Sequence, residues 1–439
     1  MKNRVLKIIL SLCLIFAVIM TQIYPAFGVT KYLGITPVMQ AKTYWCWAAG
    51  AEMGASYIYS GTKDRTQYDV VEHVKGTIFN KYPNEGGTMS ESVDGSEFIC
   101  YDNSYYDFAF TNAAFSFDTI KKHIDNGYPV QADISYYTNN TRTGGHRLVI
   151  TGVNTTDVKV RYIDPWDATT AWVTYSNFKN GLLTSTSRYD GTVYFNGDLG
   201  IITSSENDAD NYDTVEIKIL KENDYISAKN YTGIVNIESL NVPNKEINMY
   251  EFDFLSSSID IDNIQNIIVS SKSDIYKYTD EIAKNISVNN AFKLYDTDLD
   301  IVTSYKNNIP IDNIISSSYQ WNIPITDINN IVSHVISLEK HNNKWEMNKI
   351  KECAKGNNIL ANYDYNKISE ILKTQGIENA QNFKFINTGK YHTMLLYFTY
   401  NNKQYGLPFN TRPDLINLCN DTVYEMNDII NILESSFNY

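Results

Sequence analysis

The stretch QAKTYWCWAAGAEMG, residues 40–54, decides the fold, because it places a cysteine between two tryptophans at the start of a helix. Cys46 is the cysteine, and Trp45 and Trp47 flank it. Small residues dominate the turns that follow, up to about residue 59. Glycine weakens a helix by about 1 kcal/mol relative to alanine, so close packing against neighbouring backbone is the expected compensation. We therefore predict a tightly packed helix with Cys46 in its first turn and Trp45 in the core.

A histidine and an aspartate follow about 100 residues later, at the two ends of a predicted β-hairpin. Gly145 and His146 stand at the start of an apolar, β-branched run over 147–153, and Asp164 ends an alternating run over 158–163. The residues between the two runs have turn chemistry, which predicts antiparallel pairing. Such pairing places His146 and Asp164 side by side.

These three residues have the chemistry of a cysteine nucleophile. A helix N-terminus favours the thiolate of Cys46, which is the reactive form. A histidine within hydrogen-bond reach stabilises the thiolate and later protonates the leaving group, and His146 suits this role because the glycines before it leave it accessible. The carboxylate of Asp164 would orient the imidazole. The Cys46 backbone N–H and the side chain of Gln40 are the expected oxyanion donors.

The segment resembles the papain-like cysteine peptidases, in particular their compact bacterial branch, which includes secreted bacterial papain-like proteases and bacteriocin-leader peptidases. In papain-like enzymes a glutamine stands six residues before the nucleophile, as Gln40 does before Cys46, and an aromatic residue follows it, as Trp47 does. A tryptophan stands two residues after the third catalytic residue, as Trp166 does after Asp164. The resemblance implies that Trp166 shields the contact between histidine and carboxylate from water.

The sequence departs from the plant and lysosomal branch in three ways. That branch has asparagine where this chain has Asp164, and a second cysteine where this chain has Thr43. Its spacing from cysteine to histidine, about 130 to 150 residues, is also longer. The compact bacterial branch fits better, and the resemblance covers about residues 38–195. The residues expected to bind substrate or to shield the site are Trp47, Gly145 and Trp166.

The chain is expected to have an α+β fold with several parts. Residues 29–200 form the expected papain-like catalytic domain, in which helices come first and an antiparallel sheet follows. Within it, the Gly-, Ser- and Asp-rich stretch 84–106 is predicted to be a loop. Residues 201–274 are interpreted as a linker or a small β-rich region, and 275–439 as a separate α+β domain of unknown role.

The first 28 residues are typical of a secretory signal peptide. A positive segment with Lys2, Arg4 and Lys7 precedes an apolar run over 8–20, and small residues at 26–28 offer a cleavage site after Gly28. The alternative is an uncleaved N-terminal anchor, although the run is short for spanning a bilayer. We expect a secreted or cell-surface protein without stable membrane insertion after cleavage, and the amino-acid usage suggests a Gram-positive bacterium.

Charge restricts the expected partners. The chain has 37 basic and 50 acidic residues, a net charge of −13, and removal of the signal leaves −16. Nucleic acid and anionic membrane surfaces would repel such a protein. We therefore expect a protein or peptide as substrate and no nucleic-acid partner.

Four cysteines remain after the signal, too few for a disulfide scaffold of this length. Cys353 and Cys419 could form one bridge or could be separate buried thiols. No metal-ligand cluster and no cofactor motif is visible, and Asp208, Asp210 and Asp213 lack the glycine and terminal glutamate of a calcium loop, so they are interpreted as solvated linker.

The first hypothesis is thus a secreted cysteine endopeptidase that works through an acyl-enzyme. A transglutaminase or a cell-wall amidase could use the same three residues, and a catalytically inactive adhesin could retain the same fold. Either the enzyme is active on export, or the block after about Gly200 restrains it, through contact with the catalytic domain, or targets it.

Overall fold

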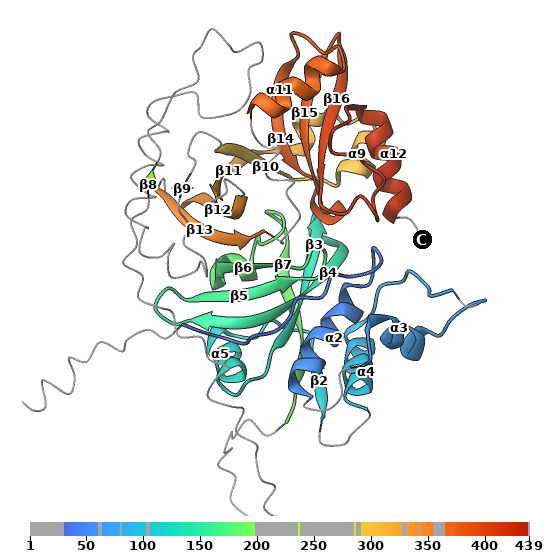
Figure 1. Ribbon diagram of the computed structural model, residues 1–439, viewed down its shortest axis with the longest axis vertical. Helices are drawn as coiled ribbons and strands as arrows, with labels where there is room; N and C mark the ends of the chain where they lie inside the picture. The colour runs from blue at the N-terminus through green and yellow to red at the C-terminus, as the bar shows by residue number, and fades with distance from the viewer. Residues whose placement is uncertain are drawn as a thin grey trace, which may run out of the picture.

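The protein folds into two regions that contact one another closely (Figure 1). The structure, a computed structural model, describes residues 30–59, 64–79, 81–101, 106–197, 236–237, 285–286, 291–326, 332–341, 344–353 and 365–437. We refer to residues 30–197 as the N-terminal region and to residues 291–437 as the C-terminal region. The signal peptide and most of the interpreted linker at 201–274 lie outside the described residues.

Helices form one half of the N-terminal region. They are α2 (Cys46–Ile58), α3 (Gln67–Lys75) and α4 (Met89–Ile99), while α5 (Phe117–Asp125) covers the sheet elsewhere. In Figure 1 the first three pack together at one side of the molecule. The small residues of α2 are buried as expected, including Ala48, Ala49 and Gly50. The predicted helix with Cys46 in its first turn is confirmed.

The prediction of a loop over 84–106 is wrong, because α4 lies within it. The helix begins with a capping box, in which the Thr88 hydroxyl accepts from the Glu91 backbone and the Glu91 carboxylate accepts from the Thr88 backbone. Its glycine and serines lie on the packed face, where a Cβ at Gly95 would approach Val70 to 2.7 Å. Residues that favour a loop in isolation therefore allow close helix packing here.

A six-stranded antiparallel sheet forms the other half, in the order β2-β7-β3-β4-β5-β6, and a short β1 pairs with the end of β4. The strands are β1 (Thr30–Tyr32), β2 (Phe108–Thr111), β3 (Val130–Thr138), β4 (Thr141–Asn154), β5 (Lys159–Asp164), β6 (Thr169–Thr174) and β7 (Arg188–Phe195), with the short helix α6 (Tyr175–Lys179) after β6. The predicted hairpin is β4 and β5, and the pairing of Val149 with Ile163 confirms its antiparallel register.

The C-terminal region is also α+β, as expected. Its elements are β10 (Phe292–Thr297), α9 (Ile301–Lys306), α10 (Ile311–Ile314), β11 (Ile315–Thr326), β12 (Val332–His341), β13 (Lys344–Glu352), α11 (Tyr365–Thr374), β14 (Gln381–Asn387), the short helix η5 (Gly389–Tyr391), β15 (Thr393–Tyr400), β16 (Lys403–Asn410), β17 (Tyr424–Glu425) and α12 (Met426–Phe437). The strands of this region pair in the order β13-β12-β11-β10-β14-β15-β16-β17. Two short strands stand apart in sequence, β8 (Asn236–Ile237) and β9 (Asn285–Ile286), and β9 pairs with β11.

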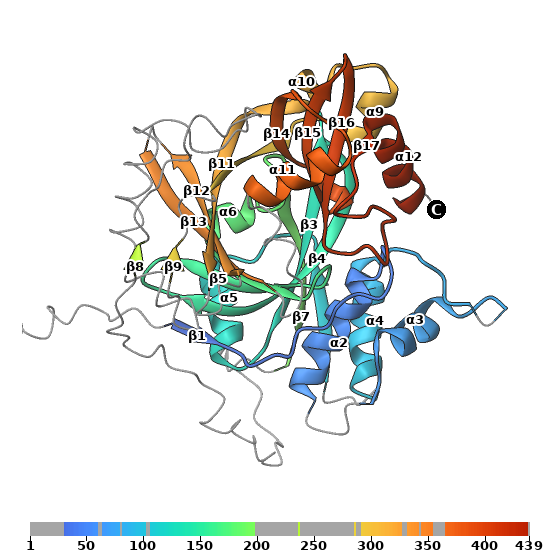
Figure 2. The same cartoon turned by 45° about the horizontal axis from the view of Figure 1, so that its top comes forward.

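One strand pair joins the two regions. Strand β13 pairs antiparallel with β6, so that Ile350 lies opposite Trp172, and the hydrogen-bonded ladder continues from one region into the other. Figure 2 shows the end of β13 reaching the sheet of the N-terminal region near β5. Because β6 begins at Thr169, shortly after Asp164, this pairing brings the C-terminal region to the end of the β4–β5 hairpin.

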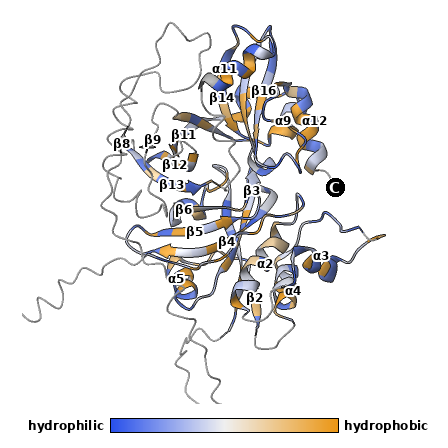
Figure 3. Ribbon diagram, in the orientation of Figure 1, coloured by the Kyte–Doolittle hydropathy of each residue, from blue (hydrophilic) through white to orange (hydrophobic). Residues whose placement is uncertain are grey.

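A second connection is made by Trp166, which belongs to the hydrophobic core of the C-terminal region although it lies in the N-terminal one. It is buried with Ile386, Tyr391 and Leu395, in a cluster that also includes the inner faces of α9 and α12. Figure 3 shows apolar residues on these two helices. Apolar packing therefore joins the two regions in addition to the strand pairing.

The four cysteines within the described residues are free. Cys353 is partly buried and Cys419 is exposed, and neither is bonded to the other, so the considered bridge is not formed. Cys100 is buried beneath α2, whereas Cys46 is partly exposed. In the described part of the chain no helix is both long and apolar enough to span a bilayer.

Candidate active site

Cys46 is the first residue of α2 and lines a cleft of about 480 Å³. The two flanking tryptophans are buried, and they fix the start of the helix by hydrogen bonds to one passing segment. The indole N–H of Trp45 donates to the carbonyl of Pro83 at 2.9 Å, and that of Trp47 to the carbonyl of Glu85 at 3.1 Å. The free N–H groups of the first helical turn favour negative charge at this position.

His146 and Asp164 meet as the hairpin predicts. The imidazole Nε2 lies 2.7 Å from Oδ1 of Asp164, and both residues are buried. The same Oδ1 accepts the backbone N–H of Trp166 at 2.9 Å, which fixes the carboxylate. Since Nε2 binds the carboxylate, Nδ1 is the ring nitrogen that remains for the thiol, and His146 is hydrogen-bonded to Cys46.

The three groups shift one another's protonation in a consistent direction. Burial alone would raise the pKa of Cys46, but the hydrogen bond and positive charge of His146, helped by Arg147, bring it below its ordinary value. Burial alone would lower the pKa of His146, but the charge and hydrogen bond of Asp164 raise it to about 10. His146 in turn holds the pKa of the Asp164 carboxyl well below its usual range, against the effect of burial. The arrangement favours a thiolate beside an imidazolium.

Gln40 is fully buried and lies behind the loop that leads to Cys46. Its side-chain amide donates to the carbonyls of Lys42 and Thr43, at 2.8 and 2.9 Å, and its backbone N–H donates to the carbonyl of Pro165 at 2.7 Å. Its Oε1 has no hydrogen-bond partner among the described residues. Gln40 therefore connects the loop before the cysteine to the loop after the aspartate, and both of its amide hydrogens are engaged there.

Trp166 is buried beside the site, and its ring is covered by a residue that the sequence did not single out. His392, from the turn between η5 and β15, stacks on Trp166 with ring centroids 4.4 Å apart and planes 13° apart. The same imidazole makes an edge contact with His146 at 4.5 Å. Nothing in the local sequence around His392 indicates this contact, because it depends on how the two regions meet.

Glycines shape the cleft on both sides of Cys46. Gly145 lies on the cleft wall before His146, where a Cβ would approach the Arg142 guanidinium to 2.9 Å. On the opposite wall, a Cβ at Gly87 would lie 2.3 Å from the Trp47 ring, so this position has no room for a side chain. Gly87 was missed from the sequence, although its place in a pair of glycines was a usable signal.

The C-terminal region supplies the remaining wall. Its cleft-lining residues include Lys390, Tyr391, Glu434 and Phe437. The Lys390 ammonium pairs with Asp300 at 2.7 Å, and the Tyr44 hydroxyl donates to the backbone carbonyl of Phe437. The cleft thus lies between the two regions, and residues distant in sequence line both of its sides.

Comparison with known families agrees with this geometry. Residues 32–192 match the model of the peptidase C39-like family. This segment has a papain-like fold and is similar to that family of cysteine peptidases. No curated protein matches the chain.

The matched segment contains all of the candidate catalytic and substrate-binding residues. We therefore call residues 30–197 the peptidase domain from here on. Its helical half carries Cys46 and its antiparallel sheet carries His146 and Asp164, which confirms the predicted papain-like α+β fold. The match ends before the C-terminal region, although that region forms part of the cleft. The described residues contain no group of three or more His, Cys, Asp or Glu side chains placed to hold a metal ion.

Proposed function

We propose that the protein is a secreted cysteine endopeptidase that hydrolyses peptide bonds through a thiolate and an acyl-enzyme. The observation that carries the proposal is the arrangement of Cys46, His146 and Asp164. The cysteine stands at a helix N-terminus in an open cleft, and the histidine beside it is bonded to a buried carboxylate at 2.7 Å.

In this mechanism the Cys46 thiolate attacks the carbonyl carbon of the substrate, and the carbonyl electrons move to oxygen. His146 then gives its proton to the leaving amine as the C–N bond breaks, which leaves a thioester on Cys46. In the second half, His146 removes a proton from water, the resulting hydroxide attacks the thioester, and the thiolate leaves with the imidazole protonated. Asp164 remains hydrogen-bonded to Nε2 throughout, so that Nδ1 donates and accepts the proton.

The developing oxyanion needs donors close to Cys46. The backbone N–H of Cys46 belongs to the first helical turn and has no partner within the helix, so it is the first donor in this proposal. Gln40 is the proposed second donor. Because its amide hydrogens bond to the carbonyls of Lys42 and Thr43, it must share one of them with the oxyanion during reaction.

The experiment compares Cys46→Ala with Cys419→Ala in the full chain. Cys419 is an exposed free thiol of the C-terminal region, so its removal controls for the loss of a cysteine. Products from casein, with and without an added primary amine, are identified by mass spectrometry. We expect wild type and Cys419→Ala to hydrolyse casein and Cys46→Ala to leave it intact while unfolding at the wild-type temperature.

The possible products separate the candidate activities. Amine-linked products in place of hydrolysis would indicate a transglutaminase. Full hydrolysis by Cys46→Ala would refute the role of the thiol, and an intact substrate with wild-type protein would favour a non-catalytic binding protein or an enzyme with a non-protein substrate. Secretion is tested by N-terminal sequencing of protein from the culture medium, where we expect a start at Val29.

A further inference from the structure

His392 lies against the bonded pair of His146 and Asp164, with its ring centroid 4.5 Å from that of His146. It follows η5 and adopts a left-handed backbone conformation, with φ 49° and ψ 27°, and its N–H donates to the carbonyl of Gly389 at 2.9 Å. A left-handed backbone is uncommon for a residue with a side chain. The turn directs the imidazole between His146 and Trp166, where it contacts both rings.

Two cavities meet at this residue. The first is the cleft of about 480 Å³ that contains Cys46 and His146, and the second is a chamber of about 240 Å³ between the two regions, which contains Asp164. Among the described residues that line them, His392 is the only one common to both. The bonded pair of His146 and Asp164 thus spans from one cavity to the other, and His392 lies beside it.

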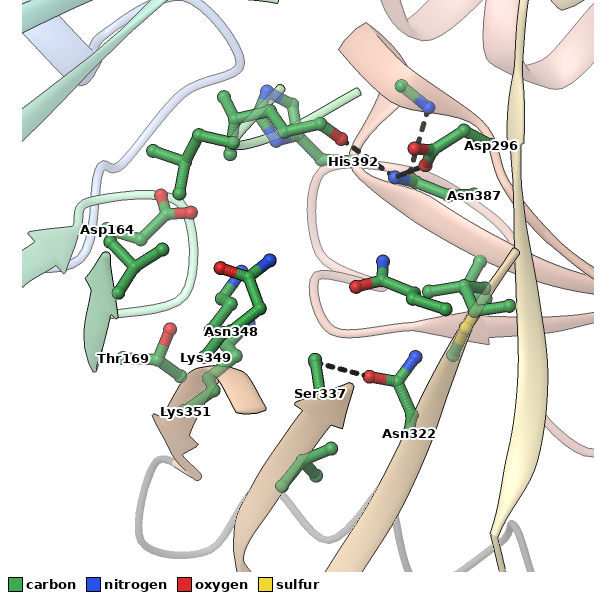
Figure 4. Close-up of a pocket in the computed structure, with 18 of the residues that line it drawn as sticks. Asp164, Thr169, Asp296, Asn322, Ser337, Asn348, Lys349, Lys351, Asn387 and His392 are labelled. Atoms are coloured by element: carbon green, nitrogen blue, oxygen red, sulfur yellow. Dashed lines mark hydrogen bonds between the residues drawn. The ribbon is translucent and has the colours of Figure 1, made fainter. Parts of the chain in front are cut away.

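The chamber is polar and charged (Figure 4). Lys349 and Lys351 reach it from β13, and Lys351 pairs with Asp167 at 3.0 Å. Burial and the neighbouring Lys351 lower the pKa of Lys349 to about 8. The buried Oδ1 of Asn348 has no hydrogen-bond partner among the described residues. Water would solvate these groups, and a chamber joined to the cleft would bring that water to the catalytic pair.

We propose that His392 is a positioning residue of the peptidase, whose ring separates the substrate cleft from the chamber that Asp164 lines and shields the contact between His146 and Asp164 from water. The inference rests on the proposed function of Cys46 and His146. Attraction between opposite charges is several times stronger in a dry environment than in water. The separation therefore maintains the imidazolium, and through it the thiolate.

The charges around the pair are compatible with this role. Burial, followed by the charge of His146, lowers the pKa of His392 to about 3, so its ring is neutral and does not repel the imidazolium at working pH. The titratable or charged groups that interact with Cys46, His146 and Asp164 include Tyr136 from β3, Arg147 from β4, Tyr162 from β5, Lys349 and Lys351 from β13, and His392. Tyr136 is neutral because burial raises its pKa well above the ordinary value.

The test compares wild type with His392→Ala, His392→Phe and His73→Ala, all in the full chain. Alanine joins the two cavities, whereas phenylalanine retains an aromatic ring in the same place. His73 is partly exposed on α3 and pairs with Asp94 at 3.1 Å outside the cleft, so its variant controls for the loss of a histidine. The readout is the rate at which iodoacetamide alkylates Cys46 from pH 4 to 10, followed on the Cys46 peptide by mass spectrometry. This readout needs no substrate.

We expect solvent to return both shifted pKa values toward their ordinary positions in His392→Ala. The pKa of Cys46 then rises, and at pH values below the wild-type pKa alkylation slows by about tenfold for each unit of that rise, because the thiolate fraction falls in proportion. His392→Phe should restore most of the wild-type rate in this acid range, and added imidazole should partly restore it in His392→Ala. His73→Ala should follow the wild-type curve.

Two outcomes would overturn the inference. One is that His392→Ala has the same dependence of alkylation rate on pH as wild type. The other is that His392→Phe and His392→Ala unfold at the same temperature and show equally shifted alkylation curves. Failure of the proposed function would look different. In that case Cys46 of the wild type would itself titrate as an ordinary thiol, with a pKa near 8.5.

Discussion

Asp164→Asn is the substitution that examines the electrostatics of the site most directly. An asparagine is nearly the same size as aspartate, and its Oδ1 can still accept from both His146 Nε2 and the Trp166 backbone N–H. The orientation of the imidazole is therefore retained while the negative charge is removed. Any change in pH dependence then reports the charge.

The magnitude follows from the pKa of His146. It lies at about 10 against an ordinary 6.5, which corresponds to about 5 kcal/mol in favour of the imidazolium. Burial opposes this shift and Cys46 supports it, so a neutral residue at position 164 lets the pKa fall toward its ordinary value. At pH 8 an imidazole with a pKa of about 6.5 is protonated only about 3% of the time, whereas wild-type His146 remains protonated.

The assay is the pH dependence of kcat/KM on a peptide substrate. Because a raised histidine pKa keeps the imidazolium until the pH passes through that value, the wild-type rate should fall only toward pH 10. In Asp164→Asn the fall should come near neutrality, so that the ratio of wild-type to variant rates increases about 30-fold between pH 5 and pH 8. A variant whose rate still holds above pH 9 would refute the assignment of the charge to Asp164.

Three further substitutions address the surroundings of the site. Arg412→Ala should lower the free energy of unfolding by about 2 to 4 kcal/mol, because the buried guanidinium donates to the carbonyls of Gln40 and Trp166 at 2.7 and 2.8 Å. A urea titration measures this change, and an unchanged midpoint would contradict the prediction. Gly87→Ala should displace the cleft wall from Trp47 and raise KM at least tenfold in steady-state assays, and wild-type kinetics would contradict the lack of room there. Gln40→Ala should lower kcat about 100-fold if the amide binds the oxyanion. A decrease in kcat of less than tenfold, together with reduced thermal stability, would mean that Gln40 only stabilises the loop before Cys46.

Much of the peptidase domain could be predicted because its signals are local. The small residues after Cys46 indicated a packed helix, and two apolar runs around a turn indicated the hairpin that joins His146 to Asp164. Helix α4 could not be recognised, because glycine and serine favour loops unless a neighbouring helix packs against them.

The contribution of the C-terminal region to the site could not be predicted. His392 and Arg412 reach the catalytic loops only because β13 pairs with β6 and because Trp166 packs into the other region's core. Such contacts depend on tertiary geometry between segments more than 200 residues apart, and neither residue stands in a local pattern of its own. The four residues of the catalytic proposal were therefore accessible from sequence, but the wall opposite them was not.

The pairing of β6 with β13 also has a consequence for the order of events during synthesis. Residues 344–352 leave the ribosome, and in the proposed secretion the export channel, after the whole peptidase domain has done so, and until then one edge of β6 is open. The domain at that stage also lacks the Arg412 bonds to the Gln40 and Trp166 loops and the ring of His392. We therefore expect the proposed active site to reach its final geometry only after the C-terminal region has emerged and folded against it.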